Sequence, residues 1–64
     1  MSELAIRNRI NYYIAEAVNH YKENNGQFDE VHKINMARIN GMVETLSMVT
    51  GKCYMVTEGG LIEA

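Results

Sequence analysis

The 64-residue sequence has few of the means by which very small proteins are usually stabilised. Its single cysteine, Cys53, excludes a disulfide within the chain. We therefore expect a reducing cytoplasm as its setting, with a disulfide between two copies as the open alternative. No spacing of Cys and His gives a four-ligand metal pattern, so we predict neither a metal nor a cofactor. Because chains below about 70–80 residues rarely build a sufficient core alone, we expect a homodimer or a higher oligomer.

Long apolar runs and an excess of positive charge are also missing. No apolar stretch approaches the ~20 residues that span a membrane, and no basic region precedes an apolar run, so we expect neither a membrane span nor a signal peptide. The formal net charge is -2, whereas nucleic-acid-binding domains normally present a basic face. Arg7, Arg9, Lys33 and Arg38 are interleaved with acidic residues. A nucleic-acid-associated accessory or regulatory role is therefore the alternative function rather than the preferred one.

What the sequence does contain is a helix-forming stretch, residues 31–49, that is apolar on two sides. When these residues are placed on a helical wheel at about 100° per residue, the apolar ones fall into one continuous arc and a second group nearly opposite it. The arc contains Val31, Met36, Ile39, Met42, Val43, Leu46 and Val49, and the second group contains Ile34, Ala37, Gly41 and Met48. A surface helix needs only one apolar stripe. This stretch therefore predicts neighbours on two sides of the helix.

The two apolar sides lead to a predicted self-interface. Its candidate residues are Ile34, Ile39, Met42, Val43, Leu46 and Val49, of which Ile39 to Val49 form a buried seam and Ile34, with Gly41 and Met48, meets a second neighbour. Asn35 interrupts the main arc and either lies at a wet rim or fixes the register of the assembly. Gly41 either permits close approach of another backbone or bends the helix.

An earlier helix is predicted over about residues 2–25. Its apolar stripe consists of Ile6, Ile10, Tyr13, Ile14, Ala17, Val18 and Tyr21. Ser2 is suited to cap its beginning, and Asn24-Asn25-Gly26 is suited to end it in a left-handed conformation. The stripe gives this helix one buried face.

The second helix is predicted over about residues 29–50, with Asp29 as its N-cap and Gly51 just past its end. The connection between the two helices is short. Helices joined in this way pack as antiparallel neighbours, so we predict a helical hairpin.

The last part of the chain changes character, and we predict a β-element over about residues 53–63. Cys53 to Thr57 is rich in β-forming residues, Glu58-Gly59-Gly60 has the composition of a turn, and Leu61 to Glu63 is suited to a returning strand. The alternative is one strand with a loose tail. An isolated hairpin is marginal in water, so it must lie on the helices or pair with another subunit. The fold predicted for residues 1–64 is thus a single, mainly α domain.

Few side chains in the sequence suggest chemistry. Glu16, His20 and His32 have the chemistry of a zinc site, but the two histidines point in different directions, so we interpret His20 as solvated and His32 as packed or capping. Cys53 lacks an activating base, and we interpret it as a small, half-buried residue that begins a strand. We predict that the chain is not an enzyme. Tyr12 lies away from the apolar stripe of its helix and is the candidate contact for another protein.

The whole chain resembles the short helical proteins encoded by bacteriophages. The features that carry this resemblance are the absence of proline, an Asn-rich first helix and the ending ARINGMVETLSMVTGKCYMVTEGGLIEA at residues 37–64. The resemblance concerns size and style, so it assigns a role to no individual residue. It implies a protein of the host cytoplasm that binds and inhibits a host defence protein. Together with the residues, it predicts a non-enzymatic, self-associating protein that interacts with another protein.

Overall fold

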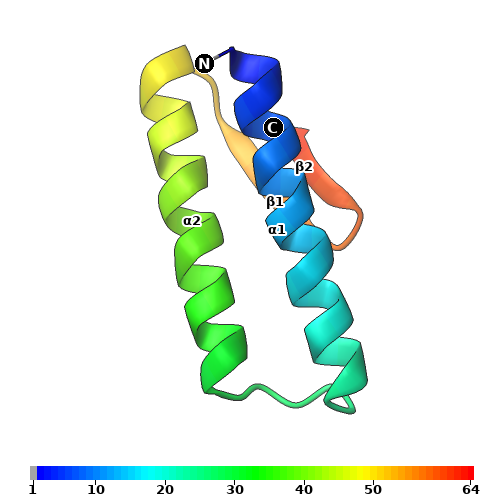
Figure 1. Cartoon of the computed structure of the whole chain (residues 1–64). Coiled ribbons are helices and arrows are strands. Elements are labelled where there is room, and N and C mark those ends of the chain that lie inside the picture. The colour runs from blue at the N-terminus through cyan, green and yellow to red at the C-terminus, as the bar shows by residue number, and fades with distance from the viewer. Residues whose placement is uncertain (1) are drawn as a thin grey trace.

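The computed structural model describes residues 2–64 and consists of a helical hairpin followed by a β-hairpin (Figure 1). Helix α1 spans Glu3–Glu23 and helix α2 spans Glu30–Thr50. Strands β1, Tyr54–Thr57, and β2, Gly60–Glu63, follow them. The prediction of two helices and then a β-element is confirmed.

Local side-chain chemistry fixes where each helix begins and ends. The Ser2 hydroxyl accepts a hydrogen bond of 3.1 Å from the amide of Ala5, and the Asp29 carboxylate accepts one of 2.8 Å from the amide of His32. These bonds satisfy amides that lack partners in the first helical turn, and both predicted N-caps are confirmed. Gly26 and Gly51 have φ of 74° and 72°, the left-handed conformation predicted at both helix ends.

The β-element is an antiparallel hairpin, so the alternative of a single strand with a loose tail is wrong. Tyr54 pairs with Glu63, Val56 with Leu61, and Thr57 with Gly60. The backbone continues the ladder beyond the strands, because the amide of Ala64 donates to the carbonyl of Cys53 at 2.9 Å. Two residues, Glu58 and Gly59, form the turn.

The hairpin folds back onto the helix pair, and the core lies between these two layers. In Figure 1 the hairpin lies behind α1, with β1 as the strand nearer to α2. The buried hydrophobic residues are Ile10, Ile14 and Ala17 of α1, Ile39 and Leu46 of α2, and Leu61 of β2. Val56 and Tyr54 are half-buried against them. All four elements therefore contribute to one core.

The structure divides the predicted self-interface into two parts. Ile39 and Leu46, 0% and 1% exposed, are covered within one chain and have no surface left for a second copy. Met42 and Val43 are half-buried against the core, whereas Ile34 and Val49 are exposed. Val49 therefore lies outside the buried seam, because the core forms on the side of α2 that carries Ile39 and Leu46.

Candidate interaction surface

The two outer edges of the β-hairpin meet very different surroundings, and the edge of β2 is covered. The amide of Leu61 points away from β1 and donates a 2.8 Å hydrogen bond to Oδ1 of Asn11 on α1. Gly60 permits this approach, because a Cβ there would lie 3.1 Å from the same oxygen and φ of Gly60 is 129°. A helix side chain thus supplies the acceptor that another strand would otherwise supply.

The edge of β1 has no such cover. In an antiparallel ladder, successive residues alternate between directing their amide and carbonyl towards the partner strand and away from it. The bond between Ala64 and Cys53 sets this alternation, so Met55 faces β2, whereas the main-chain groups of Tyr54 and Val56 point outward. Among residues 2–64, no hydrogen bond reaches these outward groups. The edge of β1 is therefore open to pairing.

The outer face of the hairpin is apolar next to this open edge. Side chains alternate along a strand, so Val56 and Leu61 face the helices while Met55 and Ile62, which are paired across the ladder, face outward. Met55 is 53% exposed and Ile62 is 47% exposed. Two apolar side chains thus lie side by side on the solvent face of a two-stranded sheet.

A polar cluster ties the beginning of β1 to the beginning of α1. The Tyr54 hydroxyl donates to Oε1 of Glu3 at 2.9 Å, and Nζ of Lys52 lies 3.3 Å from the same oxygen. Lys52 also lies 3.7 Å from Oε1 of Glu63 at the end of β2. The hydrogen bonds from Tyr54 and Lys52 lower the pKa of Glu3, and Glu3 in turn raises the pKa of Lys52. The cluster holds both strand ends against α1.

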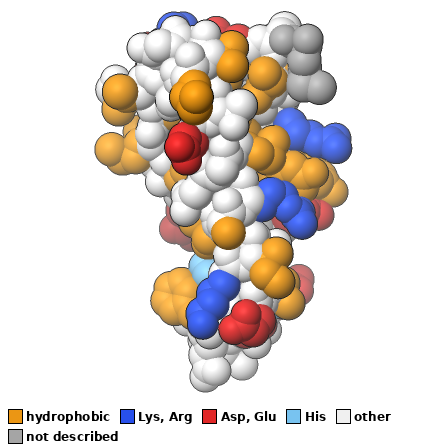
Figure 2. All heavy atoms as spheres, turned by 90° about the vertical axis from the view of Figure 1, so that its left-hand side faces the viewer, with side chains coloured by type: hydrophobic (Ala, Val, Ile, Leu, Met, Phe, Trp, Pro, Cys, Tyr) orange, Lys and Arg blue, Asp and Glu red, His pale blue; other side chains and the backbone are white. Residues whose placement is uncertain are grey.

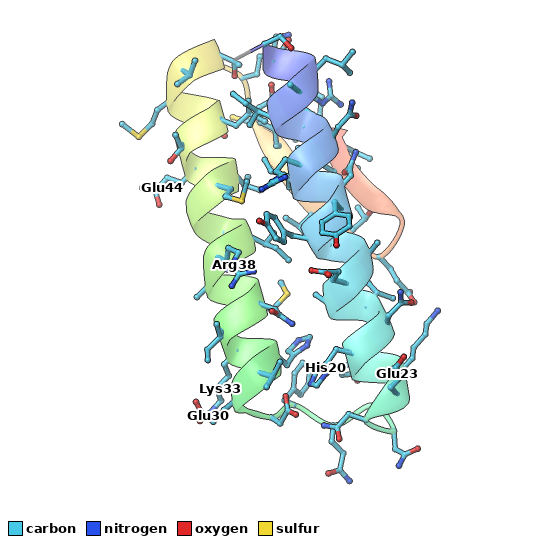
Figure 3. All side chains as sticks on the ribbon, in the orientation of Figure 1. His20, Glu23, Glu30, Lys33, Arg38 and Glu44 are labelled. Atoms are coloured by element: carbon cyan, nitrogen blue, oxygen red, sulfur yellow. The ribbon has the colours of Figure 1, made fainter. Side chains whose placement is uncertain are left out.

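A second polar cluster lies at the opposite end of the helix pair. His20 points from α1 towards the start of α2 (Figure 3), and its Nε2 lies 3.0 Å from both carboxylate oxygens of Asp29. Hydrogen bonding to Asp29, chiefly from the amide of His32, lowers the pKa of its carboxyl. The prediction that His20 is solvated is therefore wrong, because the helical connection brings the N-cap of α2 against the last turn of α1. Asp29 both caps α2 and joins the two helices.

His32 is packed, as predicted. Its ring lies 5.4 Å from that of Tyr21 and 4.8 Å from that of Phe28, and its buried Nδ1 has no hydrogen-bond partner among residues 2–64. It lines a mostly apolar hollow of about 330 Å³ between the helices beside the hairpin turn, together with Met36 and Val56. The hollow shows that the short hairpin does not cover the whole length of the helix pair.

The arginines and lysines use different partners. Each lysine lies near a carboxylate: Lys22 near Glu58, Lys33 near Glu30, and Lys52 near Glu3 and Glu63. Each arginine instead lies over a tyrosine ring, and none is ion-paired in the part of the chain that the structure describes. The guanidinium groups therefore keep their hydrogen-bonding capacity for other molecules.

Tyr12, the predicted contact for another protein, lies next to two of these arginines. Its side chain is 59% exposed, and its ring meets that of Tyr13 edge-on at 5.7 Å. Arg9 and Arg38 lie 5.6 and 5.0 Å from the centre of the Tyr13 ring, one from each helix. A hydrogen bond with Glu16 raises the pKa of Tyr12. Together, Arg9, Tyr12, Tyr13 and Arg38 form a surface that we call the Tyr–Arg face.

The remaining candidate residues do not come together in a site. Cys53 is exposed and precedes β1, so the prediction of a half-buried strand residue is wrong. Residues 2–64 contain no group of three metal-ligating side chains. Sequence reasoning missed Met55 and Asn11. The alternation of Tyr54, Met55 and Val56 was a signal for an outward Met55, whereas no sequence signal placed Asn11 beside β2.

The comparisons with known proteins add no relative to this description. No family model, no curated protein and no solved structure matches the chain. Within the part that the structure describes, neither helix combines the length and the apolar character needed to cross a membrane. The surfaces of the chain itself are therefore the guide to its function.

Proposed function

We propose that this chain is a non-enzymatic interaction protein that assembles with itself and binds another protein. The supporting observation is the distribution of its apolar side chains. Among residues 2–64, six hydrophobic residues are buried, whereas nine large ones are exposed: Leu4, Tyr12, Phe28, Val31, Ile34, Met48, Val49, Met55 and Ile62. Figure 2 shows hydrophobic side chains at several places on this side of the molecule, separated by charged and other groups. Association removes such surface from water, and a chain this short gains stability from it.

Sedimentation equilibrium over a range of micromolar concentrations tests the self-assembly. We expect the mass to approach a multiple of the 7.3 kDa of one chain and to fall on dilution. A compact chain that melts cooperatively and keeps the mass of a single copy at every concentration would contradict the proposal.

The Tyr–Arg face is the proposed contact for another protein. Tyrosine and arginine are both enriched at protein interfaces, and here two arginines without acidic partners flank the tyrosine pair. The resemblance to phage proteins suggests a host defence protein as the partner. We expect Tyr12→Ala to reduce capture of a partner from host lysate while leaving the melting temperature unchanged. Leu4→Ala, which truncates another exposed side chain of α1, is the matched control. Equal capture by both variants would exclude Tyr12 as the contact.

The same arginines favour a nucleic-acid accessory protein as the second candidate function. Guanidinium groups can contact phosphates, and the exposed ring of Tyr12 can stack on a base. A gel-shift titration distinguishes this function from the first. Binding to nucleic acid that falls steeply with salt, and that falls further in Arg38→Gln, would support it.

A further inference from the structure

We propose that two copies join edge to edge through β1, forming a continuous antiparallel sheet in the order β2–β1–β1–β2. This inference rests on the proposed self-association and assigns the surface responsible for it. The occupant of the β1 edge is a second copy of the same strand, Tyr54–Thr57.

The outward main-chain groups of β1 determine what kind of structure can cover them. Tyr54 and Val56 present amides and carbonyls in the spacing of a strand, and only another extended segment satisfies such a row along its length. On the other side of the hairpin, one side chain of α1 already occupies the corresponding position at Leu61. The edge of β2 is therefore closed at Leu61, whereas the edge of β1 is open.

The β1 edge is complementary to itself. With the two strands antiparallel and related by a two-fold axis at Met55, Tyr54 lies opposite the partner's Val56, and Val56 opposite the partner's Tyr54. Both residues direct their amide and carbonyl outward, so each pair exchanges two hydrogen bonds. A symmetric dimer needs this kind of self-complementary surface.

Pairing of the two β1 strands in this register also covers apolar side chains on the outer face of the sheet. Met55 meets the partner's Met55 across the two-fold axis on the outer face, where directly opposed Cβ atoms lie about 4.5–5.5 Å apart. Its side chain is 53% exposed in one copy, so pairing removes part of it from water. Ile62, beside Met55 on β2, extends the apolar surface on either side of the axis.

The β1 edge lacks the usual features that prevent strand pairing. Natural edges carry lysines, prolines or bulges, or are covered by other elements. The sequence of β1 is YMVT, with no charge and no proline, and its ladder with β2 is regular. In Figure 1 the edge of β1 away from β2 is turned to the side on which α2 lies, and no strand of residues 2–64 pairs with this edge.

Two substitutions of Met55 by residues of opposite charge test whether the β1 strands pair. Met55→Lys places two ammonium groups opposite each other at the two-fold axis, and Met55→Glu does the same with two carboxylates. We expect each variant alone to weaken the dimer by about tenfold or more in Kd, and an equimolar mixture to recover a heterodimer because lysine then faces glutamate. Sedimentation equilibrium measures all three samples.

Ile62→Lys is the matched control, because Ile62 is on the same outer face with similar exposure but belongs to β2, away from the axis. It should leave the dimer nearly unchanged. If wild type is a dimer and both Met55 variants remain dimers, or if their mixture does not associate, the β1 assignment is overturned while self-association stands. If wild type itself is monomeric, the proposed self-association fails as well.

Discussion

The two strands of the hairpin carry the same kind of backbone edge, but only β2 has an outward main-chain group that is bonded within residues 2–64. The Leu61 amide of β2 bonds to Asn11 at 2.8 Å, whereas the outward groups of Tyr54 and Val56 on β1 have no partner in residues 2–64. A helix side chain can replace a neighbouring strand at one position, and it needs the space left by a glycine to do so. In the described part of the chain, no side chain is hydrogen-bonded to the outward main-chain groups of β1. The contrast shows an unsatisfied strand edge in addition to the exposed apolar side chains of α2, such as Ile34 and Val49, that the sequence indicated.

The largest loss of folding stability should come from truncating Leu61, the β2 residue whose amide is bonded to α1. This side chain is 6% exposed and lies in the core with Ile10 and Ile39. Leu61→Ala should lower the free energy of unfolding by about 2–4 kcal/mol, through lost burial and the cavity left behind. Urea denaturation at a fixed protein concentration measures the change, since association adds to the apparent stability.

Ile62→Ala is its control on the same strand. Ile62 is 47% exposed, so the free energy of unfolding should fall by less than about 1 kcal/mol. Similar losses in the two variants would mean that β2 is not held by its contact with the helices.

A smaller loss of folding stability should follow from removing the Asn11 side chain, which accepts the hydrogen bond from the β2 edge. Asn11→Ala leaves the amide of Leu61 without its partner in a part-buried position, which costs about 1–3 kcal/mol. Asn8→Ala, an exposed position on the same helix, gains the same helix propensity without losing this bond. The difference between the free energies of unfolding of the two variants measures the contribution of the hydrogen bond between Asn11 and Leu61. Equal stabilities would show that the two edges of the hairpin do not differ as described.

The smallest effect should be a pH dependence of folding stability that arises from Glu3, which is bonded to the beginning of β1. The bonds from Tyr54 and Lys52 lower the pKa of Glu3 in the folded chain. A carboxyl whose folded pKa is lowered stabilises the fold above its ordinary pKa of 4.5, and this contribution is lost as the pH falls through its folded pKa. The melting temperature of wild type should therefore exceed that of Glu3→Gln at neutral pH, and the two should converge as the pH falls below the folded pKa of Glu3. A constant difference between the two variants would exclude this linkage.

Much of the local structure could be predicted from the sequence because it depends on neighbouring residues. The helix periodicity, the caps at Ser2 and Asp29 and the glycine at position 51 each act within a few residues of the feature that they determine. The β-hairpin was predicted for the same reason, although a single strand remained an alternative.

The arrangement of these elements could not be predicted in the same way. Periodicity identified Ile39 and Leu46 as residues to be buried, but it does not tell whether a second copy or the chain's own hairpin covers them. In this structure Ile39 and Leu46 share one core with buried residues of α1 and with Leu61 of β2. The contact of Asn11 with Leu61 joins positions 50 residues apart, and the site of His20 depends on how the connection places Asp29. These features depend on tertiary geometry, which helical spacing does not encode.

Amide hydrogen exchange at Val56 tests the open edge most directly. If a second copy pairs with β1, the Val56 amide should exchange slowly at high protein concentration and faster on dilution, while the Leu61 amide, bonded within the chain, should exchange at a rate independent of concentration. An unprotected Val56 amide under conditions where the protein sediments as an oligomer would show that the β1 edge is not where the copies meet.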